Sequence, residues 1–310
     1  MRNNPLSNMN TKQAITVRVI ITLAVCLTFS ITKPSGRAQV VVFSTDFESG
    51  APAQFTGIIS LESVQGYAGL GPSSNQFGGL FLRNASLSSP TTLTLTGLPP
   101  HTNISLSFLL AAIDTWDGTF SAPGAPVPDY FNVTVDGRSV FSQTLCNYRG
   151  GGQQTYVPPA GVLLTPKPYP ELGFQIRPGN PPDFGDAAFN LGLDPAFQNI
   201  PHTASTLTIS WFANGAGWQG LTDESWAIDN VSVAASLISP TLSAAASGQT
   251  LDLRWPVSFT HYFLESATSL SPGVPWESVT NSVTDLGPVF SVSVPLDAPA
   301  RFFRLRYQQP

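Results

Sequence analysis

Charged side chains are scarce in this 310-residue sequence, where Asp, Glu, Lys and Arg together make up 11%. Cysteine is scarcer still: Cys26 lies in an apolar leader, and Cys146 stands alone after it. The chain that follows the leader therefore has no intramolecular disulfide. The three histidines, His101, His202 and His261, are too few to complete a His/Cys zinc site, and there is no Gly-x-Ser-x-Gly motif.

Long apolar runs are missing except near the N-terminus. Lys12 and Arg18 precede the apolar run Val19–Ile31, and Gly36-Arg37-Ala38 supplies a small-x-small cleavage site. The run is too short to cross a bilayer. We expect residues 1–38 to form a signal peptide that is cleaved near Ala38. The mature chain would then lack a transmembrane anchor and be secreted, periplasmic or held at the cell surface.

Basic residues become rarer once the leader is removed. The leader holds five of the 14 Lys and Arg residues and none of the 19 acids, which leaves nine basic residues and a net charge of −10. Such a chain does not suit nucleic acid or an anionic membrane as a partner.

What the sequence does contain is typical of an all-β protein. It has 26 Gly and 28 Pro, and short alternating apolar runs separated by turn residues. The clearest are Ile104–Ile113 and the hairpin Tyr130–Leu145 around Asp136-Gly137. Residues 147–200 are too long for a simple connection. They are interpreted as a partly structured insertion over one rim, with a strand near Gly173–Arg177.

The segment Gly220–Val233 concentrates three carboxylates, Asp223, Glu224 and Asp229, in a chain that has few. Strict alternation would place Asp229 on the same strand face as Val231 and Val233. A carboxylate on an apolar face needs a hydrogen-bonding, ionic or metal partner.

Asp46 and Glu48 are the expected partners, because alternation places both on one side of the first strand. If the first and last strands are neighbours, these acids converge with Asp229, and no basic residue in either segment neutralises them. Calcium binds through oxygen ligands alone. The sequence therefore predicts a calcium site at Asp46, Glu48 and Asp229, with Asp223 and Glu224 as second candidates. The alternative is a solvated acidic strand end.

A second group of candidates surrounds aromatic residues near turns. Exposed Trp and Tyr rings stack on sugars, and acidic side chains accompany them here. If the two tryptophans do not pack under the insertion instead, we expect a ligand site, with a glycan as the first choice, at Asp114, Trp116, Asp117, Asp129, Tyr130 and Trp218.

The histidines and the lone cysteine are expected to be structural. His101 and His202 follow matching prolines in the two Pro-His-Thr tripeptides that lead into apolar strands. They could pair as a zinc or base site, but bonds from corner histidines to backbone carbonyls fit the ligand count better. Cys146 lies beside no cluster of basic residues in the sequence and suits a small apolar filler.

Three segments carry a resemblance to a family. LPPHTNISLSFLLAAIDTWDG from Leu98, PDYFNVTVDG from Pro128 and DESWAIDNVSV from Asp223 resemble a domain of exported bacterial proteins that often carry a PEP-CTERM anchor. Thr115 and Ala227 depart from the family's usual Ser and Gly. The likeness covers about 190 residues, and extends distantly to MAM and carbohydrate-binding jelly rolls. It implies a jelly-roll sandwich and a structural calcium held by the acids of the first and last strands.

The C-terminal part is similar to a different group. LDLRWP from Leu251, FLES from Phe263 and FFRLR from Phe302 resemble small fibronectin-III-like domains of bacterial surface proteins, with Trp255 in the core. The expected organisation is a jelly-roll β-sandwich over 39–233, a linker over 234–238 and a smaller immunoglobulin or fibronectin-III-like sandwich over 239–310.

These features favour a non-catalytic binding module with structural Ca²⁺ that recognises a glycan or other cell-surface polymer. Two other classes remain open: a structural or adhesive protein that binds surface proteins, and a polysaccharide-degrading enzyme that uses Glu224 or Asp117. A jelly roll by itself does not choose among them.

Overall fold

The computed structural model describes residues 39–119, 128–148, 153–165, 172–174, 185–298 and 300–308. This part of the chain contains antiparallel β-sheets and two short 3-10 helices, Leu191–Leu193 and Pro195–Phe197. The prediction of an all-β sandwich protein is confirmed. The predicted signal peptide lies outside the described residues. Among the residues described, no helix is long and apolar enough to span a membrane.

The larger sheet is built around two 14-residue strands, β6 (His101–Asp114) and β12 (Glu224–Leu237), which pair along most of their length. β12 also pairs with both β1 and β4, and β6 pairs with β9 and β10. The remaining strands of this sheet are β1 (Gln39–Thr45), β3 (Ser60–Ser63), β4 (Leu80–Asn84), β9 (Ala187–Asn190) and β10 (Ile200–Pro201). The first strand, β1, and the last strand of the sandwich, β12, are therefore neighbours, as predicted.

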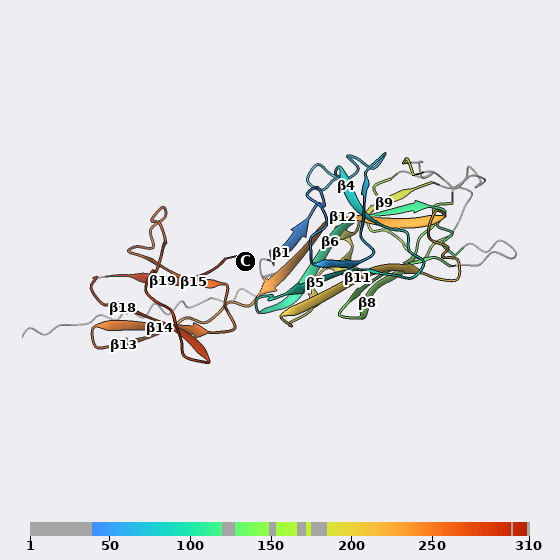
Figure 1. Cartoon of the computed structure of the whole chain (residues 1–310). Helices are drawn as coiled ribbons and strands as arrows, with labels where there is room; N and C mark the ends of the chain where they lie inside the picture. Colours follow the sequence, from blue (N-terminus) through green and yellow to red (C-terminus); the bar gives the residue numbers. More distant parts are fainter. Residues whose placement is uncertain are drawn as a thin grey trace, which may run out of the picture. The chain divides into compact units, whose positions relative to one another are not determined.

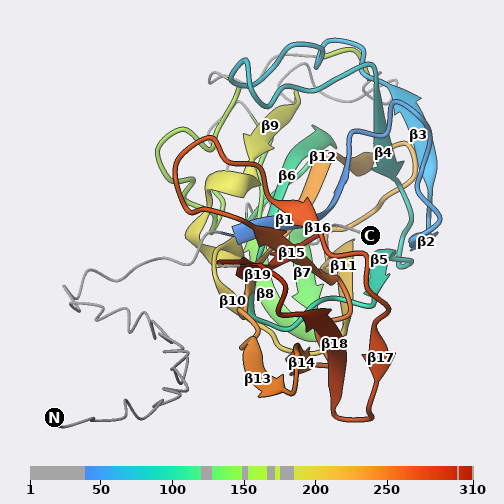
Figure 2. The ribbon, with the colours of Figure 1, turned by 90° about the vertical axis from the view of Figure 1, so that its left-hand side faces the viewer.

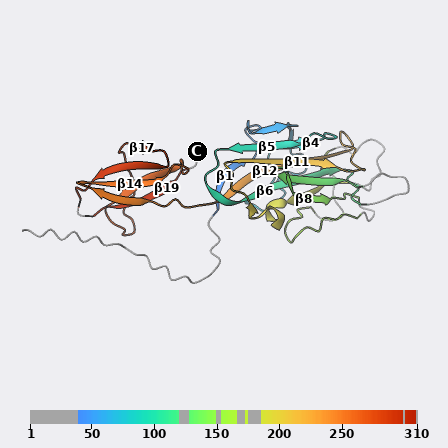
Figure 3. The ribbon, with the colours of Figure 1, turned by 90° about the horizontal axis from the view of Figure 1, so that it is seen from below.

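A five-stranded sheet packs on one face of the larger sheet, and Figures 1 and 3 show the two as layers. Phe108 of β6 contacts Trp211 of the second sheet, with ring centroids 5.8 Å apart. Trp226 of β12 likewise contacts Phe131, at 5.4 Å. The second sheet consists of β2 (Phe55–Gly57), β5 (Thr91–Thr96), β7 (Tyr130–Val135), β8 (Arg138–Thr144) and β11 (Thr206–Asn214).

The hairpin predicted around Asp136-Gly137 is confirmed by β7 and β8. Asp136 has φ 50° and Gly137 has φ 76°, the two positive values that a type I′ turn requires. The described residues of the predicted insertion include β9, both 3-10 helices and the start of β10, as expected for a partly structured segment. Gly173 and Phe174 are not in a strand, and the rest of the strand predicted near Gly173–Arg177 lies outside the described residues.

β12 departs from strict alternation at Asn230. Asn230 has φ 48°, and the pairing with β6 gains one extra residue between Asp229 and Ser232, so the strand contains a β-bulge. The bulge places Val231 in the inter-sheet core with Ile228. The prediction that Asp229 shares a face with Val231 and Val233 is therefore wrong. β12 also continues to Leu237, so most of the predicted linker is strand.

The C-terminal residues form two further antiparallel sheets with their own apolar cluster around Trp255 and Val292. One sheet has the order β13-β14-β18-β17 (Figure 2), and the other has β16-β15-β19. The segments LDLRWP, FLES and FFRLR lie in the strands β14, β15 and β19. The strands are β13 (Ser243–Ser247), β14 (Thr250–Pro256), β15 (Tyr262–Ala267), β16 (Glu277–Ser278), β17 (Thr284–Asp285), β18 (Val289–Pro295) and β19 (Phe302–Tyr307).

The two Pro-His-Thr segments meet through their histidines. The rings of His101 and His202 stack with centroids 4.9 Å apart, and Nε2 of His101 lies 2.7 Å from Nδ1 of His202. Nδ1 of His101 lies 2.6 Å from the carbonyl of Pro99, and Nε2 of His202 lies 3.1 Å from that of Thr206. Their interpretation as corner histidines bonded to carbonyls is confirmed.

This pair predicts a pH-dependent contribution to stability. Burial lowers the pKa of His101, and the neighbouring His202 lowers it further, against the carbonyl of Pro99, which raises it. In the unfolded chain the imidazole of His101 binds a proton near pH 6.5, whereas in the folded chain it does so only at lower pH. The contribution of His101 is thus fully present above about pH 6.5 and declines as the pH falls, by up to about 1.4 kcal/mol per pH unit.

Urea unfolding of the wild type and His101→Gln at pH 7.5, 6.5 and 5.5 would measure this contribution. The difference between the two proteins should shrink toward low pH, because only the wild type carries the resistant imidazole. Other titrating groups, including Asp136 at 3.1 Å from Nε2 of His202, are present in both proteins. A constant difference across this range would contradict the prediction.

Candidate metal centre

Three acidic side chains from separate segments meet at the end of the sandwich where β6 ends. Asp117 lies in the turn after β6, Asp129 directly precedes β7, and Glu224 begins β12. One carboxylate oxygen from each lies within 4.8 Å of the other two. Across the described ranges, this acidic triad is the one group of three Asp, Glu, His or Cys residues with such spacing.

Backbone contacts hold Asp117 against Asp129. The amide of Asp117 donates to Oδ2 of Asp129 at 2.6 Å, and the amide of Asp129 donates to the carbonyl of Gly118 at 3.2 Å. Gly118 has φ 66°, and a Cβ there would lie 2.1 Å from the carbonyl oxygen of Gln153. Glycine is therefore required for the turn that brings the two aspartates together.

A tight turn before β12 positions Glu224. Gly220 and Leu221 both have φ 59°, and the amide of Leu221 donates to the carbonyl of Ala85 at 2.6 Å. The amide of Glu224 donates a hydrogen bond to the carbonyl of Gly220 at 3.3 Å. Oε2 of Glu224 accepts a hydrogen bond from the amide of Gln219 at 2.9 Å. The glutamate is thus fixed by its own turn.

Burial and mutual repulsion oppose ionisation of the triad. Burial raises the pKa of Glu224 to about 9, and the charge of Asp129 adds to the shift. Burial raises the pKa of Asp129 to about 7, although the amide of Asp117 favours its anion. Burial also raises the pKa of Asp117 to about 6, with a contribution from Asp223. Among the described residues, the charged neighbours that act on these groups are all acidic, so a cation would relieve the repulsion.

Two oxygens of the triad have no hydrogen-bond donor among the described residues. They are Oδ1 of Asp129 and Oε1 of Glu224, and both side chains are 0% exposed. An unpartnered buried carboxylate oxygen costs a kcal/mol or more. Calcium accepts six to eight oxygen ligands and needs no nitrogen or sulfur. The donor set of the acidic triad therefore fits a hard divalent cation.

At the predicted cation site of Asp46, Glu48 and Asp229, backbone amides bind the carboxylates instead. The charges of Glu48 and Asp46 do act on Asp229, whose pKa burial raises to about 6. However, Asp229 accepts from the amides of Gly78 and Asn230, at 2.9 and 2.7 Å. Asp46 and Glu48 are exposed and lie in the turn after β1 rather than on one strand face.

The carboxylate of Glu48 also accepts hydrogen bonds from backbone amides, those of Gly79 and Leu80. Backbone amides thus satisfy these carboxylates, and the three do not form a compact ligand set within the described residues. The prediction that they are the principal metal ligands is corrected in favour of the acidic triad, to which Glu224 alone of the five predicted metal ligands belongs.

Two other predicted residues border the acidic triad. Asp223 is buried, and Thr115 Oγ1 donates to its Oδ1 at 3.2 Å and to its carbonyl at 2.8 Å. Its charge contributes to the raised pKa of every triad member. Asp114 ends β6 with φ 66°, and its amide donates to Oδ1 of Asp186 at 3.0 Å. Asp223 and Asp114 thus lie next to the triad but are not members of it.

The tryptophans of the predicted ligand site are buried. Trp116 is 0% exposed and Trp218 is 8% exposed, and their rings pack with centroids 5.1 Å apart. Their indole nitrogens donate to the carbonyls of Ser225 and Ser86, at 2.9 and 3.1 Å. Neither ring presents an open face, so the expectation of a stacking platform here is wrong. Tyr130 is half-buried at the start of β7.

Comparison with known proteins adds little. No protein-family model matches the sequence, and no curated protein matches it. A solved catalytic domain of a GH87 α-1,3-glucanase in complex with tetrasaccharides is similar at a TM-score of 0.26 and 15% identity, over 69% of this chain and 30% of that one. Dimeric latent PorU from Porphyromonas gingivalis gives 0.26 and 11%, over 79% and 19%.

The chain thus spans less than a third of the length of either structure. At these scores the matches assign neither a family nor an activity. What the fold and the site define is an all-β sandwich protein with a buried acidic cluster suited to a cation.

Proposed function

We propose that this protein is an exported, non-catalytic binding module in which the acidic triad holds a structural Ca²⁺ and the sandwich recognises a glycan at or outside the cell surface. The observation that carries the metal part is the pair of buried oxygens on Asp129 and Glu224 that have no hydrogen-bond donor among the described residues. The signal-like leader and the resemblance to exported bacterial domains support export. The C-terminal sheets would space or dock the module.

A structural role for the cation follows from the burial of its ligands. Asp129 and Glu224 are 0% exposed, so a substrate has no access to them. A cation there would join the ends of β6, β7 and β12, which belong to both sheets of the sandwich. Its removal should loosen that end of the sandwich without changing the rest of the core.

Calcium titration of the purified chain Gln39–Pro310 tests this role. At a free calcium concentration 100 times Kd, binding stabilises the folded state by about 2.7 kcal/mol. For a chain of this size the melting temperature should rise by about 5 to 10 °C and fall again with chelator. Magnesium at equal concentration is the control, because it demands smaller, octahedral sites. An unchanged melting temperature together with no calorimetric binding would refute the calcium proposal.

Glycan recognition needs its own readout. Purified Gln39–Pro310 would be assayed against soluble and insoluble polysaccharides with calcium and with chelator. We expect binding in the presence of calcium, and the chelator arm shows whether the end of the module that holds the cation contributes to it. Absence of binding to every polysaccharide, together with self-association, would instead favour the adhesive class.

The second candidate function is polysaccharide cleavage. It is favoured by Asp117, which is partly exposed and whose raised pKa of about 6 suits a general acid. Release of reducing ends by the wild type that is lost in Asp117→Asn would support it. Binding without release would exclude it for the polysaccharides tested.

A further inference from the structure

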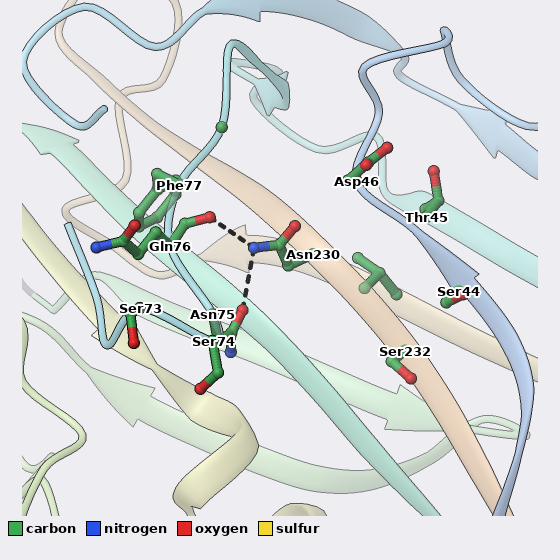
Figure 4. Close-up of a pocket in the computed structure, with 12 residues that line it drawn as sticks. Ser44, Thr45, Asp46, Ser73, Ser74, Asn75, Gln76, Phe77, Asn230 and Ser232 are labelled. Carbon is green, nitrogen blue, oxygen red and sulfur yellow. Dashed lines mark hydrogen bonds between the residues drawn. The ribbon is translucent and has the colours of Figure 1, made fainter. Parts of the chain in front are cut away.

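A groove lies on the outer face of the larger sheet, away from the acidic triad. It has a volume of about 650 Å³ and lies between the end of β1, the segment 73–78 and the bulge of β12 (Figure 4). Volumes of this order are typical of sites for small ligands. We call it the hydroxyl groove because most of its lining side chains carry hydroxyl or amide groups: Ser44, Thr45, Ser73, Ser74, Asn75, Gln76, Asn230 and Ser232.

The bulge builds one wall of the hydroxyl groove. Nδ2 of Asn230 donates to Oδ1 of Asn75 at 3.0 Å and to the carbonyl of Gln76 at 2.7 Å (Figure 4). Beside it, the buried carboxylate of Asp229 accepts from the amide of Gly78 at 2.9 Å. These bonds tie segment 73–78 to β12. Its polar side chains are therefore held in place before any ligand arrives, which lowers the entropic cost of binding.

Strand register builds the floor. Ser44 of β1 pairs directly with Ser232 of β12, and both residues line the groove. Because Val231 and Val233 point into the core, Ser232 points to the outer face. Each hydroxyl can donate one hydrogen bond and accept others. The floor thus presents hydroxyls across neighbouring strands at β-sheet spacing.

The lining limits the class of ligand. The described residues that line it include no Lys, Arg or His, and the one charge among them is the exposed carboxylate of Asp46. An anionic ligand would meet no counter-charge. Phe77 is 2% exposed, so an apolar ligand would find no aromatic surface. A neutral ligand rich in hydroxyls suits donors and acceptors of this kind, and the Asp46 carboxylate can accept from two adjacent hydroxyls.

We infer that the hydroxyl groove is the binding site for a neutral saccharide segment, recognised chiefly through hydrogen bonds. This inference rests on the proposed glycan-binding function and specifies its site and ligand class. It also moves the site from Trp116 and Trp218, whose rings are buried, to the outer face beside the β12 bulge.

The test uses the chain Gln39–Pro310 with neutral tetrasaccharides of glucose, mannose, galactose and xylose, and with uronic-acid oligosaccharides as the anionic set. Isothermal titration calorimetry would measure each. Ser232→Leu places an apolar side chain on the groove floor. Ser210→Leu is the matched control, since Ser210 is likewise partly exposed but lies on β11 in the other sheet. Asp46→Asn removes the single lining charge with little change of shape.

We expect at least one neutral tetrasaccharide to bind the wild type and Ser210→Leu alike. Ser232→Leu should weaken binding tenfold or more, and Asp46→Asn severalfold, with melting temperatures within a few degrees of the wild type. Amide chemical shifts of Ser44, Asn75 and Ser232 should move on titration, which provides a second readout should Ser232→Leu fail to fold.

Two results would overturn the inference while leaving glycan recognition intact: full affinity in both groove variants, or shift changes confined to other surfaces. Preferential binding of uronic-acid oligosaccharides would also overturn it. If no oligosaccharide or polysaccharide binds, the glycan function itself fails and the groove inference fails with it, whereas the calcium response is measured separately.

Discussion

Gly118→Ala should lower the free energy of unfolding by about 2 to 5 kcal/mol and weaken the calcium response. A left-handed backbone costs a non-glycine residue about 1 to 2 kcal/mol, and φ at Gly118 is 66°. The added methyl would also lie 2.1 Å from the carbonyl oxygen of Gln153 and 2.7 Å from Cβ of Cys146. Relief of such overpacking costs about 1 to 3 kcal/mol more.

Gly137→Ala is the matched control for this change. Its φ is 76°, and a Cβ there would meet nothing within 4 Å. It therefore carries the backbone cost without the steric one, and it lies in the β7–β8 hairpin rather than beside the acidic triad. Urea unfolding of both variants, with and without calcium, separates the two costs. Equal losses of unfolding free energy in the two variants would show that the turn at Gly118 accommodates the added methyl group without steric cost.

Glu224→Gln should have opposite effects in the absence and presence of calcium. Without calcium, the variant should be more stable than the wild type at pH 8, because folded Glu224, with a pKa of about 9, must bind a proton that the unfolded chain releases, and a neutral glutamine carries no such cost. With calcium it should be the less stable of the two. At 100 times Kd the wild type gains about 2.7 kcal/mol from the cation, and loss of a ligand charge removes most of that gain.

Glu277→Gln is the control for removal of one negative charge, since Glu277 is exposed on β16. It should leave both melting temperatures within about 1 °C of the wild type, because exposed substitutions usually change stability by less than 0.5 kcal/mol. Melting curves in chelator and in calcium measure all three proteins. A wild-type calcium response that persists in Glu224→Gln would remove Glu224 from the cation site.

The two predictions separate the architecture of the site from its charge. Gly118 acts through the backbone that brings Asp117 to Asp129, whereas Glu224 acts through an oxygen that has no donor in the described part of the chain. A protein that fails only the second test has the predicted turn at Gly118 but binds its cation without Glu224. A protein that fails only the first has a site whose turn tolerates a side chain.

The candidate site shows where local reasoning fails. All three members of the acidic triad are candidate site residues in the sequence. Alternation and proximity along the chain place Asp117 and Asp129 in a ligand site with tryptophans, and Glu224 in a calcium site with Asp229. Register decides otherwise: Glu224 pairs with Asp114 across the sheet, which brings it to Asp117 more than a hundred residues earlier.

The sequence by itself determined the all-β class, the hairpin at Asp136-Gly137 and the scarcity of basic residues around the candidate acids. These depend on composition and on backbone preferences that a few adjacent residues carry. The tertiary structure decided which acids meet, that the Asn230 bulge places Val231 and Val233 on the face opposite Asp229, and that Trp116 and Trp218 are buried. The physical reason is that a one-residue bulge reverses every later side chain in a strand, and its position becomes fixed only when distant strands pair.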